Sequence, residues 1–183
     1  CGECGGDGSS CSEHFNVEID PTGSSTLFIF LDLITGLDIG DEVGLFDANG
    51  IINSEGDVGE ILVGTGEWTG TQLEVVAIRS IDLLEFGGPI LPGAVDGSTM
   101  TLKVWDISEQ EEYNATYEID FGSGTFDNLF TSISEVGEEE ECASGYYDCE
   151  GICDGTAVED CLGECGGDAV VDECGECNGD GID

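Results

Sequence analysis

The sequence predicts an all-β protein, a β-sandwich followed by an irregular connector that disulfides cross-link. Three observations support this. Between residues 12 and 136, apolar residues form short runs or alternate with polar ones, and Gly- and Pro-containing turns separate the runs. No stretch carries a sustained helical period. All ten cysteines lie outside this region, in residues 1–11 and 142–183, so the core of the sandwich must form without cross-links.

The strands follow from these runs. In residues 113–121 apolar side chains alternate with polar ones, so the polar face should lie in water. Asn49-Gly50 is expected to turn the chain, and residues 82–98 read as a long loop. Strands of this number and spacing favour a jelly-roll-like or immunoglobulin-like sandwich, without fixing the strand order. The expected strands are residues 15–19, 25–34, 41–48, 60–63, 72–79, 100–105, 113–121 and 126–133.

Charge excludes several classes of partner. The chain has 42 acidic residues against two basic ones, Arg79 and Lys103, and a formal net charge of −40. Nucleic-acid binding requires Lys and Arg to neutralise phosphates, and an anionic membrane surface repels a chain of this sign. No apolar run approaches the roughly 20 residues that span a bilayer. Such acidity predicts a folded state that recruits cations.

An even number of cysteines set among Gly, Asp and Asn predicts a disulfide framework and an oxidising, extracellular location, either secreted or on the cell surface. Zinc is the alternative, because Cys1/Cys4 and Cys174/Cys177 are C-x2-C pairs. An N-terminal cysteine also occurs in lipidated bacterial proteins. The absence of an initiator Met and of a signal peptide suggests a mature product or an excerpt. The cysteines are Cys1, Cys4, Cys11, Cys142, Cys149, Cys153, Cys161, Cys165, Cys174 and Cys177.

The two ends of the chain share a pattern. Cys1-x2-Cys4 is followed by six residues and then Cys11, while Cys174-x2-Cys177 is followed by six residues and the end of the sequence. We therefore expect copies to continue head to tail. On this interpretation residues 1–11 belong to the connector of the preceding copy, residues 12–136 form the sandwich, and residues 137–183 form the next connector, which starts at a run of four glutamates.

Acidic residues interspersed with glycine predict calcium sites in the connector. Calcium takes six to eight oxygen ligands on a sharply bending backbone, which Gly permits. The alternative is a merely soluble acidic linker. A second site could form where Asp47 and Asn49 approach Glu55 and Asp57, although a plain turn explains that segment equally well. The predicted connector ligands are Asp7, Asp148, Asp154, Asp160, Asp168, Asp172, Glu173, Asn178, Asp180 and Asp183.

Two groups of segments resemble known families. CGGDAVVDECGECNGDG and CGECGGDGSSC resemble the Cys/Asp/Gly repeats of large secreted bacterial proteins and are distantly similar to calcium-loaded thrombospondin type 3 repeats. IGDEVGLFDANG, WTGTQLEVVAI and VDGSTMTLKVWD resemble β-sandwich modules of secreted adhesive or surface proteins of Bacteroidota type. The resemblance implies an extracellular, repetitive architecture that calcium rigidifies, and no catalytic activity.

Enzyme chemistry has little support in the residues. The single histidine, His14, adjoins the cysteine-rich head, and no nucleophile motif accompanies it. Among 42 acids, no pair of carboxylates stands out as a glycosidase pair. Asn114-Ala115-Thr116 is a glycosylation sequon whose Asn114 should face water. Trp68 and Trp105 could stack on sugar rings, although a tryptophan in a sandwich is more often part of the core.

These observations predict a non-enzymatic structural subunit of an extracellular fibre or repetitive surface protein. Copies of the chain would join head to tail through a connector that calcium and disulfides stiffen, since heterologous contacts of this kind give open filaments. The alternative is a carbohydrate-binding or adhesion module of a secreted protein, for which the connector is only a spacer and glycans are the partner.

Overall fold

The structure, a computed structural model, describes residues 14–127, 129–139, 144–150, 153–172 and 175–178. Contacts divide the chain into two units, residues 1–139 and residues 140–183. Every strand among these residues belongs to the first unit, and the second unit is the cysteine-rich connector, so each is described by itself.

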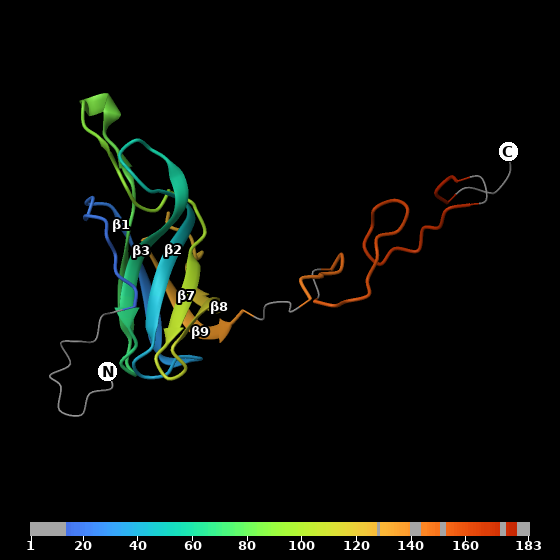
Figure 1. The fold of residues 1–183 in the computed structure, drawn as a ribbon, viewed down its shortest axis with the longest axis horizontal. Coiled ribbons are helices and arrows are strands. Elements are labelled where there is room, and N and C mark those ends of the chain that lie inside the picture. The colour runs from blue at the N-terminus through green and yellow to red at the C-terminus, as the bar shows by residue number, and fades with distance from the viewer. Residues whose placement is uncertain (1–13, 128, 140–143, 151–152, 173–174, 179–183) are drawn as a thin grey trace. The chain divides into compact units, whose positions relative to one another are not determined.

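In the first unit seven strands form one sheet in the order β3-β2-β7-β8-β9-β1-β4 (Figure 1). Neighbours pair antiparallel, except that β1 and β9 run parallel. The two edges meet, since a Cβ on Gly64 of β3 would lie 2.9 Å from the carbonyl oxygen of Val76 of β4. The sheet is thus nearly closed into a barrel. Its strands are β1 (Ser25–Thr35), β2 (Glu42–Ile51), β3 (Val58–Glu67), β4 (Leu73–Ile78), β7 (Thr101–Asp106), β8 (Glu111–Phe121) and β9 (Phe130–Glu138).

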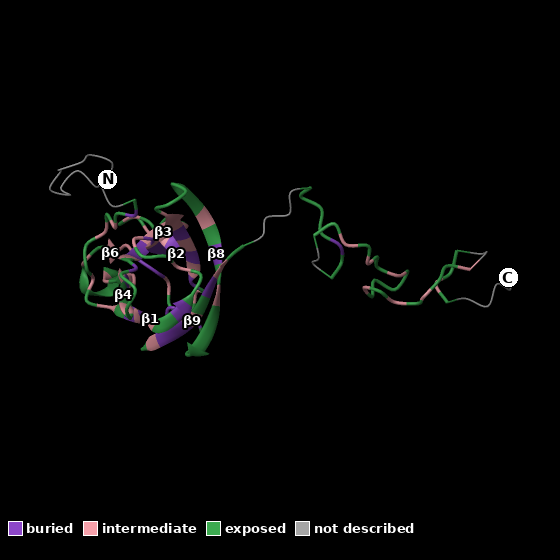
Figure 2. Cartoon of the chain, turned by 90° about the horizontal axis from the view of Figure 1, so that it is seen from below, coloured by how far each residue is buried: buried purple, intermediate pink, exposed green. Residues whose placement is uncertain are grey.

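The barrel interior is apolar. Buried residues alternate with more exposed ones along β1, β4 and β7, as the pleat requires. β2, β3 and β9 instead bury two or three consecutive residues, and Figure 2 shows the buried parts of the strands in purple. Trp68, which follows β3, is 4% exposed and belongs to the same cluster. The buried hydroxyl of Thr26 is satisfied, because its Oγ1 donates to the carbonyl oxygen of Phe126. Among the described residues, the Nε of Arg79 is the buried side-chain atom that has no hydrogen-bond partner. The largest fully buried side chains include Phe28, Phe30, Leu45, Leu102, Phe126 and Ile133.

A small hairpin extends from the barrel after β4 (Figure 1). It consists of β5 (Ile81–Asp82), the 3-10 helix η1 (Leu84–Phe86) and β6 (Ile90–Leu91). The sequence predicts a loop here, because strands of two residues are too short to show a periodic pattern. Phe86, near its tip, is 85% exposed. Among the described residues no helix is long and apolar enough to span a membrane.

The prediction of an all-β fold is confirmed. The main strands belong to one sheet that nearly closes on itself. The assignment to a jelly-roll-like or immunoglobulin-like sandwich stays a prediction. Residues 15–19 form no strand in the structure, although Phe15 is buried and Asn16 exposed as the alternation predicts. At the start of this segment the N–H groups of His14 and Phe15 donate to the side-chain carboxylate of Glu42 in β2, and not to backbone carbonyl oxygens as in a strand ladder.

Two strand boundaries also differ from prediction. Asn49-Gly50 does not turn the chain, because β2 continues through it with a register shift between Asp47 and Gly50. The turn comes later, at residues 53–57, where Asn53 Oδ1 accepts the N–H of Glu55 and of Asp57. At the C-terminal end β9 runs to Glu138, so it includes Gly137 and Glu138, the first two residues of the predicted connector.

Candidate functional site

The connector contains a structural repeat. Isolated β-bridges join Tyr147 to Cys153, Glu159 to Cys165, and Val171 to Cys177, so the same contact recurs at intervals of twelve residues (153, 165, 177). The sequence follows this period in DCEGICDGTAVE (148–159), DCLGECGGDAVV (160–171) and DECGECNGDGID (172–183). Each unit has Asp first, Gly fourth, Cys sixth, Gly eighth and an aliphatic residue eleventh.

This period is absent from the predictions above. The numbers of residues between successive cysteines are uneven and hide the period. The period becomes visible when only every second cysteine from Cys153 onward is considered. Cys153, Cys165 and Cys177 are the sixth residues of the three units. In the third unit the first cysteine is Cys174 and not the residue after Asp172, which breaks the simple pattern of spacings.

Disulfides link each unit to the next. Cys149 bonds to Cys165 and Cys161 bonds to Cys177, each across 16 residues and with Cα atoms 5.6 Å apart. In both, the second residue of one unit is joined to the sixth residue of the following unit. Cys153 is also disulfide-bonded. Because Cys177 is oxidised, it is not available as a thiolate ligand for zinc. Cys1, Cys4, Cys11, Cys142 and Cys174 lie outside the described residues.

The aspartate that opens each unit organises the backbone around it. Asp160 Oδ1 accepts the N–H of Leu162 at 2.9 Å and of Glu164 at 3.0 Å, while Oδ2 accepts the N–H of Ala169 at 3.2 Å. The hydrogen bond from Glu164 and those from the other N–H groups hold the pKa of Asp160 below its usual value of 3.8. Gly167 is required beside it, since a Cβ there would overlap Asp160 Oδ2.

The other two units repeat this arrangement. Asp148 Oδ1 accepts the N–H of Glu150 at 3.0 Å, and its Oδ2 accepts the N–H of Ala157 at 3.1 Å. Asp172 Oδ1 accepts the N–H of Glu176 at 2.8 Å. These donors lie two, four or nine residues after the aspartate, as they do around Asp160. In the units that begin at Asp148 and Asp160, the carboxylate therefore ties the turn to the loop that follows it.

These bonds bear on the calcium prediction. A carboxylate offers about four lone-pair positions, and backbone N–H groups take three of those of Asp160. Asn178 Oδ1 lies 3.4 Å from the N atom of Val170, while Asp154 and Asp168 are exposed. Within the described ranges no three His, Cys, Asp or Glu side chains form a group that could hold a metal ion. The predicted ligands Asp7, Glu173, Asp180 and Asp183 lie outside those ranges.

The second predicted calcium site, at Asp47 and Asn49 in the barrel, is not formed as the sequence predicts. Asp47 is fully buried, with Oδ1 accepting the N–H of Asn49 at 2.9 Å and Oδ2 that of Val95 at 2.8 Å. It thus holds the bulge of β2 against the segment after β6. Asn49 is exposed, and Asp57 accepts a bond from the side chain of Asn53 in the next turn. The structure does not bring these residues together as a metal-binding group.

The chain reaches and leaves the barrel beside the same end of β8. The ring of His14 stacks on Trp105 with centroids 4.0 Å apart, and its Nε2 lies 2.7 Å from Glu112 Oε2. Where the chain leaves the barrel after β9, the N–H of Glu139 donates to the carbonyl oxygen of Asn114 at 2.8 Å. Glu112 and Asn114 are two residues apart near the start of β8.

The two tryptophans differ in their accessibility to a sugar. Trp68 is in the core, and Trp105 is half-buried with one ring face against His14. Asn114 and Thr116 are both exposed on β8, as the alternation predicts, and Thr116 Oγ1 donates to the carbonyl oxygen of Gly137. The sequon is thus accessible, and its modification stays a prediction.

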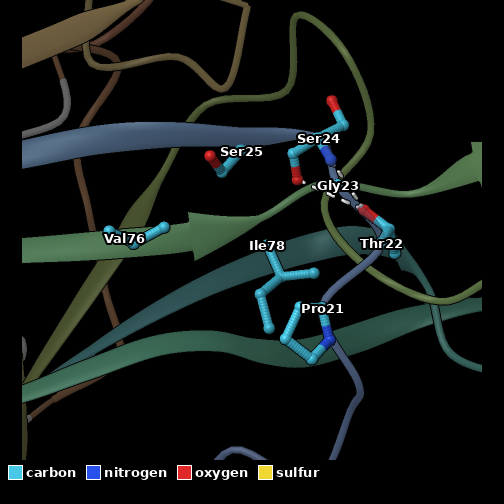
Figure 3. Close-up of a pocket in the computed structure, with 7 residues that line it drawn as sticks. All are labelled: Pro21, Thr22, Gly23, Ser24, Ser25, Val76 and Ile78. Carbon is cyan, nitrogen blue, oxygen red and sulfur yellow. Dashed lines mark hydrogen bonds between the residues drawn. The ribbon is translucent and has the colours of Figure 1, made fainter.

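A pocket of about 340 Å³ lies where β1 begins, between the segment 21–25 and β4 (Figure 3). Val76, Ile78 and Pro21 supply apolar surface, and Thr22 Oγ1 is engaged with the carbonyl oxygens of Ser24 and Arg79. No titratable side chain lines it, so it lacks the groups needed for acid–base chemistry.

Comparison of the chain with protein-family models, with curated proteins and with solved structures found no match. The resemblance to secreted Cys/Asp/Gly repeats and to thrombospondin type 3 repeats therefore rests on the sequence motifs alone. It stays a prediction, as do the extracellular location and the bacterial source that it implies.

Proposed function

We propose that this protein is a structural subunit of an extracellular fibre or repetitive surface protein, in which copies join head to tail through the cysteine-rich connector. The observation that carries the proposal is the cross-linking of successive twelve-residue units. Each described disulfide joins one unit to the next, and nothing in this arrangement limits the number of units. Repeats that contact only their neighbours are typical of elongated architectures.

The barrel is suited to be the module that such a polymer presents to its surroundings. Because the chain reaches it beside Glu112 and leaves it beside Asn114, both attachments lie at one end of β8. The β5–β6 hairpin, with Phe86 exposed near its tip, is then available for contacts. Tension along the connectors then acts between two neighbouring points and does not cross the whole sheet.

Calcium completes the proposal. The chain carries a formal net charge of −40, and bound divalent cations would relieve the repulsion between neighbouring units. The exposed carboxylates of Asp154 and Asp168 are open for ligation, together with backbone carbonyl oxygens, while the first aspartate of each unit holds the backbone. Extracellular calcium modules bind at roughly 10⁻⁴ to 10⁻³ M, so occupancy depends on millimolar calcium.

Assembly is tested on the purified chain by electron microscopy and by mass analysis under denaturing, non-reducing conditions, with and without calcium. We expect filaments or a ladder of covalent multimers in calcium. A single 19.1 kDa species without filaments in both conditions would contradict the proposal.

The calcium component is tested separately by calorimetric titration. Asp154→Asn combined with Asp168→Asn should weaken calcium binding, whereas Glu109→Gln combined with Glu111→Gln removes the same charge from the barrel and should leave it unchanged. Equal titration curves for the two variants would refute the assignment of calcium to Asp154 and Asp168.

A further inference from the structure

We infer that the connector is a cleavage-tolerant tether, which stays covalently continuous after its backbone is cut. The order of the bonded cysteines along the chain is the basis for this. Cys161 lies between Cys149 and Cys165, and Cys165 lies between Cys161 and Cys177. The two disulfide loops therefore overlap. Every peptide bond between Cys149 and Cys177 is spanned by at least one disulfide, and those between Cys161 and Cys165 are spanned by both.

The overlap of the disulfide loops has a use because the peptide bonds that they span are exposed to proteases. The described connector has no apolar core, and its aliphatic side chains are open to solvent, with Val158 69% exposed, Leu162 67% and Val170 70%. Exposed loops are the preferred sites of proteolytic nicking. In the barrel, burial and the strand ladder protect the backbone. In the connector, the two disulfides that together span residues 149–177 supply the protection that packing does not.

The hydrogen bonds of the units hold the cut ends in place. A cut between residues 158 and 159 leaves the Asp148–Ala157 hydrogen bond on one side, and the bonds of Asp160 on the other. The Cys149–Cys165 disulfide joins the two sides. Hydrolysis adds one water, with OH to the carbonyl carbon and H to the nitrogen, and leaves both sulfur atoms oxidised. No reductant is consumed or needed.

The chain is suited to a single-cut experiment, because its only two basic residues, Arg79 and Lys103, lie in the barrel. Val158→Arg and Val170→Arg each create one trypsin site in the connector at an exposed position. Digestion of the full chain is continued until the reduced sample shows two fragments. We expect both variants to run as one covalent species without reductant and as two fragments with it. Separation without reductant would overturn the inference.

Paired cysteine variants identify the bond that holds each cut. With Cys149→Ala and Cys165→Ala together, the chain cut after position 158 loses the disulfide that spans that cut and should separate without reductant, while the chain cut after position 170 should stay joined. Cys153 stays oxidised in this variant, so a chain cut after position 158 that stays joined would show that the Cys153 disulfide also spans the cut and would overturn the assignment to Cys149–Cys165 alone. With Cys161→Ala and Cys177→Ala together, the chain cut after position 170 should separate without reductant, while the chain cut after position 158 should stay joined. Any other pattern would show that different bonds hold the connector. The experiment needs neither calcium nor assembly, so its failure and that of the proposed function are distinguishable.

Discussion

The barrel and the connector are ordered by different means within one chain. The barrel contains no cysteine among its described residues, and its order comes from a buried cluster that includes Phe28, Phe30 and Leu102. The described connector buries no aliphatic side chain, and disulfides and carboxylate–backbone hydrogen bonds hold it. Burial is therefore needed where the chain must form a sheet, whereas a short repeat can be fixed by disulfides together with carboxylate–backbone hydrogen bonds.

One device is common to both regions. With 42 acids and two bases, most carboxylates cannot find a basic partner, and several accept backbone N–H groups instead. Asp41 and Asp47 do so in the barrel, and Asp148 and Asp160 do so in the connector. Hydrogen bonds to charged groups are stronger than those between neutral groups. An acidic chain can thus use its excess charge to fix turns.

Reduction of the disulfides should give the largest difference in stability between the connector and the barrel. A thiol reductant removes bonds that each contribute about 2–4 kcal/mol to the connector, and nothing apolar replaces them. We expect the amide protons of residues 153–172 to lose protection from hydrogen exchange, while thermal unfolding of the barrel, followed by the fluorescence of buried Trp68, stays unchanged. A barrel that melts earlier after reduction would show that the two regions depend on each other.

A cavity in the barrel should give the opposite result. Phe28 is fully buried, with its ring 5.7 Å from that of Phe126. Phe28→Ala should lower the free energy of unfolding of the barrel by about 3–5 kcal/mol, measured by urea titration. The disulfides of the connector should form as before. Phe86→Ala, at an exposed position, is the control and should change this free energy by less than about 0.5 kcal/mol.

Removal of a single carboxylate from the barrel should have a smaller effect. Asp47→Ala leaves the N–H groups of Asn49 and Val95 without their acceptor, at about 1–3 kcal/mol for a buried unsatisfied group. The loss in urea titrations should be the same with and without a calcium chelator, because these oxygens serve the backbone. A loss seen only in calcium would instead support a metal at Asp47. Glu109→Ala, at an exposed position of the β7–β8 turn, should be nearly neutral.

Acid should give the smallest and most local effect, in the connector. Because the pKa of Asp160 is lowered in the folded unit, its contribution to stability is fully present above about pH 3.8, the unfolded value. The contribution is lost as pH falls through the lower folded pKa. Chemical shifts of the Leu162, Glu164 and Ala169 amides should follow one titration in that range. Asp160→Asn should abolish the shared titration, whereas Asp168→Asn should leave it in place.

Much of the barrel could be predicted from the residues. The alternation of Met100, Leu102 and Val104 with polar neighbours places β7 correctly, and these three side chains are nearly or fully buried. The prediction was wrong where local signals conflicted with long-range pairing. Asn49-Gly50 is a strong turn signal, but Asp47 is bonded to Val95 and β2 continues through the bulge.

The connector shows what a single sequence leaves open. Its cysteines predicted disulfides but not their pairing, since many pairings are compatible with the same spacing. Its aspartates predicted calcium, because a carboxylate near glycine is typical of calcium loops. In the structure Asp160 first serves three backbone N–H groups. That role depends on which amides the loop brings near, and composition does not show this.

The sequence by itself determined the all-β class, the acidic surface and the confinement of cysteines to the two ends, because periodicity, charge and residue counts are local properties. Only the tertiary structure decided that the sheet nearly closes into a barrel, that the chain reaches and leaves it beside one end of β8, and that disulfides join each connector unit to the next. These depend on contacts between residues distant in sequence, whose free energy no local pattern encodes.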